Sequence, residues 1–417
     1  MLFERQLAAL ALRGEADLYR GNAARLLIDG PQTFAAMRQA ISQARHRVLL
    51  EMYIVEDKGV AADFATLLMH KAAQGVAVAL LYDSIGSMES DPAFFERLRA
   101  GGVQVCAFNP IVPTERVSPW RPWHRNHRKV LVVDSDFAFT GGINLSNVYA
   151  SGSGGSSGSG GSGGIGGSRG SGKVRDSPPR QLDDEALLSG WRDTQVELQG
   201  PAVQPMAAAF RQTWQEQRCP GALPPAPPPR VAKPGSRVVK IAASDPREGL
   251  NRSYSALLAA IGAAQRSVSI TMAYFAPGDA IVDALSQAAQ RGVEVQLVLP
   301  GRSDVKLVMH AARSYYEGML RAGVRIHEMH HAVMHAKTAV VDGVFSSVGS
   351  SNLDGRSIDG NHELDVVVLG DEFGAEMESL FARDVQASQE VVLRTWQARG
   401  LASRLMEWLA RTVEPLL

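Results

Sequence analysis

The two halves of the chain repeat one pattern of helix followed by strand, and this repeat constrains the fold more than any other feature. FAAMRQAISQARHRVLLEMYI, from Phe34, resembles YSALLAAIGAAQRSVSITMAYF, from Tyr254, in period and length. In both segments, apolar residues at helical spacing give way to a short apolar run with little polar alternation. Such strands suit the interior of a sheet that is covered on both faces. The repeat therefore predicts an α/β fold in two copies.

A second helix and strand follow each repeat, in LLMHKAAQGVAVALLYD (67–83) and ALSQAAQRGVEVQLVLP (284–300). Gly75 and Gly292 stand where each of these helices is expected to end. With 417 residues, 45% of them hydrophobic, the chain is long enough to bury two ordinary cores. We expect two pseudo-symmetric α/β/α sandwich lobes, with any active site at their interface.

Two stretches interrupt the globular pattern and predict the domain boundaries. The Gly/Ser run at 151–172 has the composition of a flexible coil, whereas the prolines of Pro220 to Pro229 favour a stiff, extended spacer. We expect a first lobe at 1–218 carrying a disordered insertion at 151–172, and a connection at 219–236. The second lobe, at 237–417, ends in an amphipathic helix.

Charge, cysteine content and hydropathy exclude several classes of protein. Lys plus Arg and Asp plus Glu both total 43, so the chain lacks the basic excess of a nucleic-acid binder. Cys106 and Cys219 are the only cysteines, which supports neither a disulfide framework nor a cysteine-based zinc site and fits a reducing cytoplasm. Charges interrupt the first residues, and no window offers about 18 uncharged apolar residues. Any membrane contact is expected to be peripheral, at the cytoplasmic face.

The two halves also share a motif that can carry chemistry. HRKVLVVD (127–134) and HAKTAVVD (335–342) both fit HxKxxxxD, and GGIN (141–144) and GSSN (349–352) follow at the same distance. In a strand, His-x-Lys places both side chains on one face, because side chains alternate with a period of two. Gly-x-x-Asn can bring a backbone amide and a side-chain amide to an anion. The expected ligand is a phosphate.

On these paired motifs the chain resembles the phospholipase D superfamily, and its layout resembles the bacterial cardiolipin synthase branch. The resemblance implies a histidine nucleophile that attacks a phosphodiester and forms a phosphohistidine, which a second alcohol or water resolves. It also implies His127 as nucleophile and His335 as general acid and then base, with these roles open to exchange. Four residues would surround the non-bridging oxygens: Lys129, Lys337, Asn144 and Asn352. No metal or cofactor is expected.

Four carboxylates complete the candidate site. Asp193 and Glu363 each begin a short β-like run and could orient the catalytic histidines, as carboxylates do in hydrolases. The alternative is a solvated charge at the start of a strand. Asp134 and Asp342, at the far end of each motif, are expected to hold backbone amides and thus to be structural.

The sequence indicates the substrate less clearly than it indicates the reaction. SPWRPWHRNHRK (118–129) leads into the first motif and interleaves tryptophans with cations, which suits an anionic lipid surface but also a nucleic-acid groove. Its residues are Trp120, Arg121, Trp123, His124, Arg125 and Arg128. The amphipathic tail, with Trp396 and Trp408, could lie on a membrane or pack on its own domain. We expect cardiolipin synthesis from phosphatidylglycerol, with lipid hydrolysis, nuclease activity and an inactive lipid-binding scaffold as alternatives.

Overall fold

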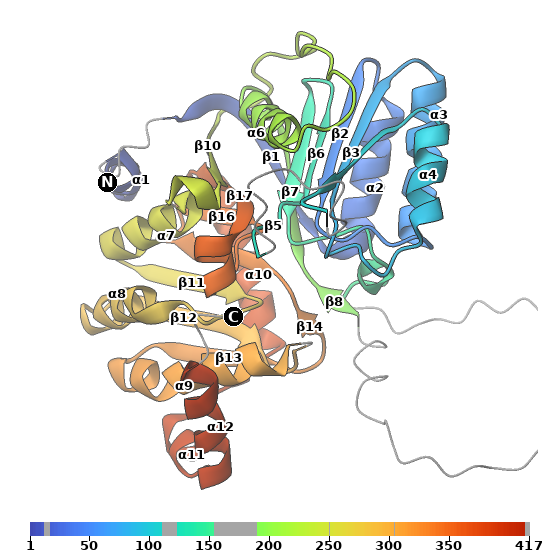
Figure 1. Ribbon diagram of the computed structural model, residues 1–417. Helices are drawn as coiled ribbons and strands as arrows, with labels where there is room; N and C mark the ends of the chain where they lie inside the picture. The colour runs from blue at the N-terminus through green and yellow to red at the C-terminus, as the bar shows by residue number, and fades with distance from the viewer. Residues whose placement is uncertain (12–16, 111–122, 154–189, 250, 304, 413–417) are drawn as a thin grey trace, which may run out of the picture.

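The computed structural model describes residues 1–11, 17–110, 123–153, 190–249, 251–303 and 305–412, which form two lobes side by side (Figure 1). Three predictions fall wholly or largely outside these residues. They concern the Gly/Ser insertion at 151–172, the segment with Trp120 and Arg121, and the last five residues of the chain.

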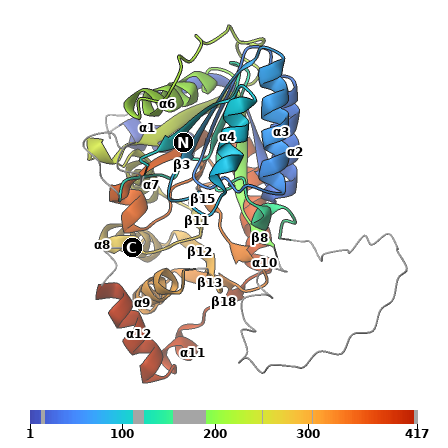
Figure 2. The ribbon, with the colours of Figure 1, turned by 45° about the vertical axis from the view of Figure 1, so that its right-hand side comes forward.

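The first lobe is a sheet with the strand order β1-β9-β7-β6-β2-β3-β4. Its strands are β1 (Tyr19–Ile28), β2 (Arg47–Met52), β3 (Ala77–Asp83), β4 (Gln104–Phe108), β6 (Val130–Val133), β7 (Phe137–Gly141) and β9 (Thr194–Gln199). Figure 2 shows three helices side by side on the outer face of this sheet: α2 (Asp29–Ser42), α3 (Val60–Ala73) and α4 (Pro92–Ala100). Helix α6 (Val203–Glu216) packs against β6 and β7 from the opposite side. The lobe is therefore a three-layer sandwich.

The second lobe repeats this order as β10-β17-β16-β15-β11-β12-β13, with a short strand added at the edge. Its strands are β10 (Arg237–Ser244), β11 (Ser267–Met272), β12 (Glu294–Pro300), β13 (Arg325–Met329), β15 (Lys337–Val341), β16 (Phe345–Gly349), β17 (Asn361–Leu369) and the edge strand β18 (Gln389–Glu390). Its main helices are α7 (Arg252–Ala263), α8 (Gly278–Gln290), α9 (Lys306–Ala322) and α10 (Asp371–Gln386). The predicted pseudo-symmetric two-lobed α/β fold is confirmed.

The repeated helix–strand units have the predicted local structure. Helix α2 leads into β2, in which every residue is buried, and α7 leads into β11, in which all residues but Ser267 and Ser269 are buried. Gly75 and Gly292 follow the ends of α3 and α8 with φ of 85° and 90°, a backbone conformation that favours glycine. The periodicity of the sequence therefore predicted the repeated helices and strands correctly, and the two glycines marked where α3 and α8 end.

The two lobes share one continuous sheet, which the sequence did not predict. Strands β1 and β10 pair antiparallel, with Tyr19 opposite Val239, and so join the two halves by main-chain hydrogen bonds. Two short parallel pairs also cross between the lobes. They are β5 (Arg125–Asn126) with β17, and β8 (Trp191–Arg192) with β14 (Val333–Met334). These crossings bring both histidine motifs to the interface.

The proline-rich connection lies against the first lobe. Ser135 Oγ donates to the Pro227 carbonyl at 2.6 Å, and the Arg47 guanidinium donates to the Pro224 carbonyl at 3.4 Å. Both contacts lie at one end of the antiparallel pair of β6 and β2, where the turn after β6 adjoins the start of β2. The extended spacer thus runs over the lobe it leaves.

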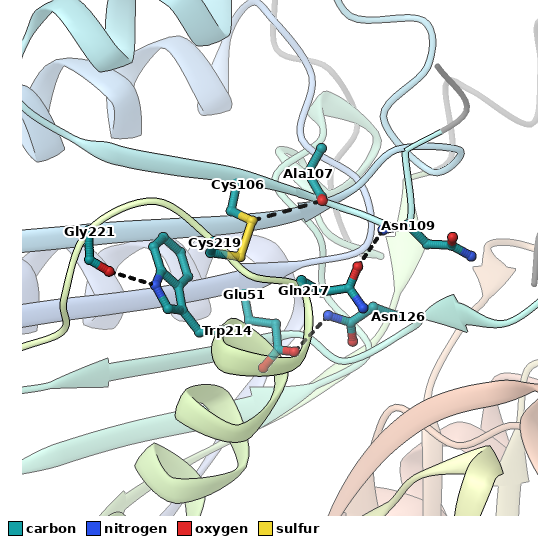
Figure 3. The surroundings of a disulfide bond; sticks show 9 residues. All are labelled: Glu51, Cys106, Ala107, Asn109, Asn126, Trp214, Gln217, Cys219 and Gly221. Atoms are coloured by element: carbon teal, nitrogen blue, oxygen red, sulfur yellow. Dashed lines mark hydrogen bonds between the residues drawn. A yellow bond between two sulfur atoms is a disulfide. The ribbon is translucent and has the colours of Figure 1, made fainter. Parts of the chain in front are cut away.

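Cys106 and Cys219 form a disulfide, so the sequence-based rejection of a disulfide is wrong (Figure 3). Their Cα atoms lie 5.5 Å apart although 113 residues separate them in sequence. Cys106 belongs to β4 and Cys219 follows α6, so the bond ties the edge of the first sheet to the helix on its inner face. Two cysteines without a local pattern gave no sign of this proximity, which only the tertiary fold creates.

Candidate active site

A pocket of about 330 Å³ opens between the two lobes, and both motif histidines line it. Four aromatic side chains contribute to its walls: Tyr53, Tyr149, Trp191 and Tyr274. The other lining residues are Ile54, Arg125, Asn144, Val305, Val308, Asn352, Asp354, Arg356 and Asn361. The pocket combines an apolar wall with convergent polar groups, as small-molecule sites generally do.

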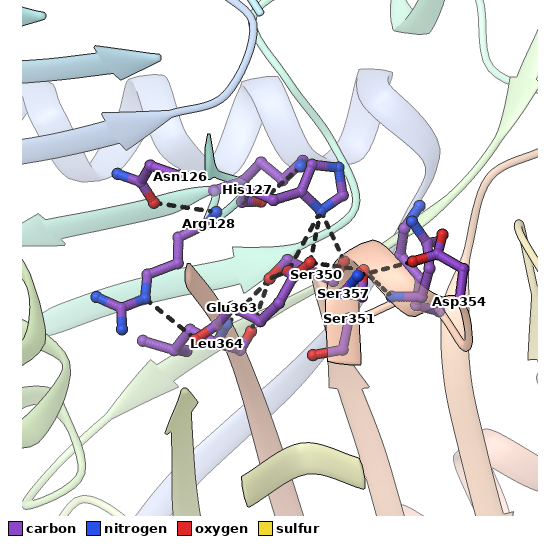
Figure 4. Close-up of polar contacts among 12 residues, drawn as sticks. Asn126, His127, Arg128, Ser350, Ser351, Asp354, Ser357, Glu363 and Leu364 are labelled. Carbon is purple, nitrogen blue, oxygen red and sulfur yellow. Dashed lines mark hydrogen bonds and ion pairs between the residues drawn. The ribbon is translucent and has the colours of Figure 1, made fainter. Parts of the chain in front are cut away.

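His127 is held by a carboxylate of the opposite lobe (Figure 4). Its Nδ1 lies 3.0 Å from Oε1 and 3.2 Å from Oε2 of Glu363, which is fully buried in β17. Ser350 Oγ donates to Glu363 Oε2 at 2.5 Å, and Ser357 Oγ donates to Oε1 at 2.7 Å. A carboxylate that accepts from Nδ1–H fixes the tautomer with Nε2 unprotonated. Nε2 is then the nitrogen available to a ligand.

His335 is held in the same crossed manner by the first lobe. Its Nδ1 lies 2.8 Å from Asp193 Oδ2, and the Tyr149 hydroxyl lies 3.2 Å from the same nitrogen. Asp193 is fully buried, and its Oδ1 accepts from the Thr194 amide at 2.7 Å. The alternative of solvated carboxylates at strand starts is therefore wrong for both Asp193 and Glu363.

Main-chain hydrogen bonds also link each histidine to the opposite lobe. The His127 amide donates to the His362 carbonyl at 3.0 Å, and the His335 amide donates to the Arg192 carbonyl at 2.8 Å. Each histidine is thus anchored through its main chain and its ring to the lobe that does not contain it. The two half-sites depend on each other for their geometry.

The motif lysines lie immediately beside these histidines. Lys129 Nζ donates to the His127 carbonyl at 2.6 Å, while Lys337 Nζ lies 3.0 Å from His335 Nδ1 and also donates to the His335 carbonyl. The expected strand geometry is only partly correct. Residues 127–129 precede β6 rather than forming part of it, whereas Lys337 is the first residue of β15.

The motif asparagines both line the pocket, but their contacts differ. Asn144 Oδ1 accepts from the Ile54 amide at 3.0 Å, and its Nδ2 lies 3.4 Å from the Tyr149 hydroxyl. Asn352 Oδ1 is buried with no hydrogen-bond partner in the part of the chain that the structure describes. A buried polar atom of this kind is suited to a ligand.

Asp134 and Asp342 hold backbone amides, as predicted for the motif aspartates. Asp134 accepts from the amides of residues 45, 46 and 47, and Asp342 accepts from those of residues 265, 266 and 267. Their φ values are 54° and 56°, a left-handed conformation that Asp tolerates better than most residues. Each fixes the start of the strand that pairs with its motif strand.

Two arginines that the sequence suggested for a lipid-docking loop are buried instead. Arg125 pairs with Asp83, and Arg128 donates to the carbonyls of Glu363 and Ser244. Their exposed fractions are 7% and 4%. Both stabilise the strand crossing below His127, so neither is placed to meet a lipid surface outside the pocket. Trp123, by contrast, is 73% exposed.

Burial and neighbouring charges set the protonation of the site. Burial lowers the pKa of His127, and Lys129 lowers it further, against the opposing effect of Glu363. Burial raises the pKa of Glu363, but His127 and Lys129 outweigh it and hold that pKa below its usual value. Burial raises the pKa of Asp193 to about 6 and lowers that of Lys129 to about 7. His127 is thus neutral beside an ionised carboxylate.

The site contains residues that the sequence reasoning missed. Tyr53 packs its ring 4.9 Å from that of His127, and Trp191 packs 5.0 Å from His335. Tyr53 and Tyr274 both stand near the ends of the repeated segments, in MYI and AYF, although Tyr274 corresponds in register to Ile54; a tyrosine at this place in both halves was the available signal. Ser350 and Ser357 gave no comparable signal, because their function depends on where Glu363 lies in the fold.

Within the described ranges, no group of three or more His, Cys, Asp or Glu side chains is arranged to hold a metal ion. Among the helices of those ranges, none has the length and apolar character needed to cross a membrane.

Comparison with known proteins adds to this geometry. The family model described as "Cardiolipin synthase, PLD-like domain" matches residues 37–152 and 257–385. Cardiolipin synthase A of Pseudomonas aeruginosa is 33% identical over 412 residues, which cover 99% of this chain and 76% of that protein. Cardiolipin synthase of Geobacillus thermodenitrificans is 30% identical over 420 residues, with the same coverage of both chains.

Solved structures share the fold at lower sequence identity. Phosphatidylserine synthase of Haemophilus influenzae aligns with a TM-score of 0.63 and 12% identity, covering 99% of this chain and all of that one. Polyphosphate kinase of Porphyromonas gingivalis aligns with a TM-score of 0.53 over 87% of this chain and 50% of that one. Both matches concern the fold alone. By the family model and its curated relatives, the chain belongs to the cardiolipin synthase family, the phosphatidyltransferases of the phospholipase D superfamily.

Proposed function

We propose that this enzyme transfers a phosphatidyl group from one phosphatidylglycerol to a hydroxyl of a second lipid and releases glycerol. The observation that carries the proposal is the pair of buried histidine–carboxylate contacts, His127 with Glu363 and His335 with Asp193, at one pocket between the lobes. Two histidines at one site fit a reaction that needs a nucleophile and a proton carrier.

In the first step, Nε2 of neutral His127 attacks the phosphorus of the donor. A nitrogen–phosphorus bond forms, the phosphorus–oxygen bond to glycerol breaks, and His335 gives a proton to the departing oxygen. In the second step, His335 takes a proton from the acceptor hydroxyl. The acceptor oxygen then bonds to phosphorus and displaces His127. The cycle balances, because His335 regains the proton that it gave and His127 passes on the phosphoryl group that it received.

The environments of the two histidines support this division of roles. His127 has a lowered pKa and an ionised partner, which suits a nucleophile that must stay unprotonated. We propose that Lys129 and Lys337 offset the charge that grows on the phosphoryl oxygens, and that Asn144 and Asn352 donate to those oxygens.

A donor with a nitrophenol leaving group would separate the two histidines, because nitrophenolate departs without being protonated. His335→Ala should release about one nitrophenol per chain and then stall, since no base remains to activate the acceptor. His127→Ala should release none. A burst from His127→Ala and none from His335→Ala would exchange the two roles.

We further propose that the enzyme binds anionic phospholipid membranes as a peripheral protein. Helix α12 (Leu401–Thr412) buries Glu407 and Ala410 but exposes four large apolar side chains by 44–61%. They are Leu405, Met406, Trp408 and Leu409. Helix α12 packs on α9, the helix whose N-terminal end contributes Val308 to the pocket wall. An apolar helix face next to the pocket suits a substrate that is supplied from a bilayer.

Vesicle sedimentation tests this docking surface. Replacing Leu405 and Trp408 by serine should reduce the fraction of enzyme that sediments with phosphatidylglycerol vesicles. The matched control replaces Met88 and Val231, which are 66% and 58% exposed elsewhere, and should sediment normally. Equal sedimentation of both double variants would assign α12 to domain packing alone.

The side of the membrane is a separate proposal. The cytoplasmic face was inferred partly from cysteines without a framework, and the Cys106–Cys219 disulfide removes that argument, because such bonds persist mainly in oxidising compartments. The cytoplasmic face stays a prediction. Alkylating thiols in intact cells before and after reduction would test it, since free thiols fit the cytoplasm and a persistent disulfide does not.

Product analysis tests the activity itself. The purified enzyme is incubated with labelled phosphatidylglycerol vesicles in the presence of a chelator, and the lipid products are resolved. Cardiolipin together with glycerol is the expected result. Phosphatidic acid alone would mean that water resolves the phosphohistidine, and no lipid product at all would refute the proposal.

A further inference from the structure

We propose that Arg356 forms a second anion subsite, which binds the phosphodiester of the acceptor lipid while the histidines hold the phosphate of the donor. This inference rests on the proposed function, since it assigns a residue to the acceptor of that reaction. Its basis is a cation in the wall of the catalytic pocket with which none of the described residues forms an ion pair.

Arg356 differs from every other charged side chain in the pocket wall. Arg125 is paired with Asp83, and the two histidines are paired with Glu363 and Asp193. Asp354 is buried and accepts from the Ser357 amide at 2.7 Å. The side chain of Arg356 is exposed and has no hydrogen bond or ion pair with any residue that the structure describes. Its guanidinium is therefore free to take a ligand.

The backbone of Arg356 is anchored although its side chain is free. It begins a single π-helical turn, Arg356–Gly360, and such turns are frequent at functional sites. The next residue, Ser357, donates to Glu363 at 2.7 Å and accepts from the Asn352 amide at 3.1 Å. Asn251 Nδ2 donates to the Ser357 carbonyl at 2.6 Å. Arg356 is therefore held at a fixed place relative to the His127–Glu363 pair.

The corresponding position of the first lobe is apolar. Counting four residues on from the motif asparagines, Arg356 follows Asn352 and Val148 follows Asn144. Val148 is partly buried and packs against the core of the first lobe. The two half-sites, alike in their histidines, lysines and asparagines, thus differ in charge at this position. A reaction that joins two unlike partners, a donor and an acceptor, can use such a difference.

The structure of cardiolipin limits how far the acceptor phosphate can lie from the reacting phosphorus. The two phosphates of cardiolipin are joined by one three-carbon glycerol bridge, so the acceptor phosphate lies one bridge away from the reacting phosphorus. Arg356 and both motif histidines line one pocket of about 330 Å³, so the two phosphates would share this cavity. Guanidinium is also the side-chain group best matched to a phosphodiester, because it can donate two parallel hydrogen bonds.

The test offers the enzyme two lipid acceptors that differ in the phosphate. Vesicles contain equal amounts of phosphatidylglycerol and monoacylglycerol, which both present glycerol hydroxyls, but only the first carries a phosphodiester. Transfer gives cardiolipin in one case and acylated phosphatidylglycerol in the other. The measured quantity is the ratio of these products, which does not depend on the overall rate.

Arg356→Gln should lower the ratio of cardiolipin to acylated phosphatidylglycerol about tenfold or more, as expected for loss of a hydrogen bond to a charged group. Arg356→Lys should give an intermediate ratio. Arg383→Gln removes an exposed arginine of α10, outside the pocket, and should keep the wild-type ratio. This control separates acceptor binding from a general effect of charge on vesicle binding.

Two results would overturn the subsite. One is an unchanged product ratio in Arg356→Gln, and the other is a proportional loss of both products, which would assign Arg356 to the donor step or to the fold. Inorganic phosphate at millimolar concentration should not lower the ratio in the wild type, because a site for free phosphate, unlike one for a lipid, would be blocked by it. Failure of the proposed function would look different, since the wild type itself would then make no cardiolipin.

Discussion

Replacing Glu363 by glutamine tests the crossed pairing of the site with one atom changed. Glu363 accepts hydrogen bonds from His127 Nδ1, Ser350 Oγ and Ser357 Oγ at 3.0, 2.5 and 2.7 Å. Glutamine keeps the shape but turns one acceptor oxygen into an NH₂ donor. Either a serine must then rotate its hydroxyl or His127 must face a donor.

The size of the effect follows from these contacts. If the amide donates to Nδ1, the proton of His127 moves to Nε2 and the attacking nitrogen loses its lone pair. In a Ser-His-Asp site, the Asp→Asn change that produces the wrong tautomer lowers kcat about 10⁴-fold, which corresponds to about 5.5 kcal/mol of transition-state stabilisation. Rotation of a serine would lessen the loss, so we expect a fall in kcat of about 10³–10⁴-fold. The free energy of unfolding should fall by about 1.5–3 kcal/mol, the usual contribution of a hydrogen bond to a charged group.

The assay measures turnover of phosphatidylglycerol together with the melting temperature of each variant. Glu328→Gln is the matched control, because Glu328 is also buried and accepts two hydrogen bonds from Arg313 at 2.9 and 3.0 Å, but outside the pocket. It should lower the melting temperature and leave the turnover of folded enzyme intact. If Glu363→Gln stays within about tenfold of the wild type, orientation of His127 by this carboxylate is refuted.

Three further predictions follow from other contacts. Because the pKa of Lys129 is about 7, its charge should be lost and kcat/KM should fall as pH rises through 7, while protonation of His127 inactivates the enzyme only below pH 6.5. Lys129→Arg should move the alkaline limb upward, and an unmoved limb would exclude Lys129 as its source. Cys219→Ser opens a loop of 113 residues and should cost up to about 4.7 kcal/mol in chemical denaturation, whereas an unchanged midpoint in oxidised protein would mean that the bond is absent. Asp342→Asn weakens hydrogen bonds to three backbone amides and should destabilise the second lobe by about 2 kcal/mol without a matching loss of kcat in the folded fraction.

Features that repeat along the chain could be predicted from the sequence. The helix–strand periodicity from Phe34 and Tyr254 predicted both lobes, and the two HxKxxxxD motifs located both histidines. Local propensity and spacing determine such features, so one sequence is sufficient to detect them. The backbone contacts of Asp134 and Asp342 were predictable for the same reason, since they lie one strand away.

Features that depend on contacts between distant segments could not be predicted. Nothing local indicates that Glu363 faces His127 rather than His335, because that choice is made by β17 crossing to β5. The Cys106–Cys219 bond is invisible for the same reason. The arginines at 125 and 128 were mistaken for surface groups because the composition of a segment does not reveal which side chains the fold buries.

The exchange of carboxylates between the lobes also bears on how such a chain can arise and change. A half-length protein of this design would hold a histidine without its partner carboxylate, so it could work only as a pair of copies. Joining the copies in one chain keeps that pairing at any protein concentration and allows each half to mutate separately. Val148 and Arg356 illustrate this, since two positions at the same distance from the motif asparagines differ in charge. Fusion thus converts a symmetric site into one that can distinguish its two substrates.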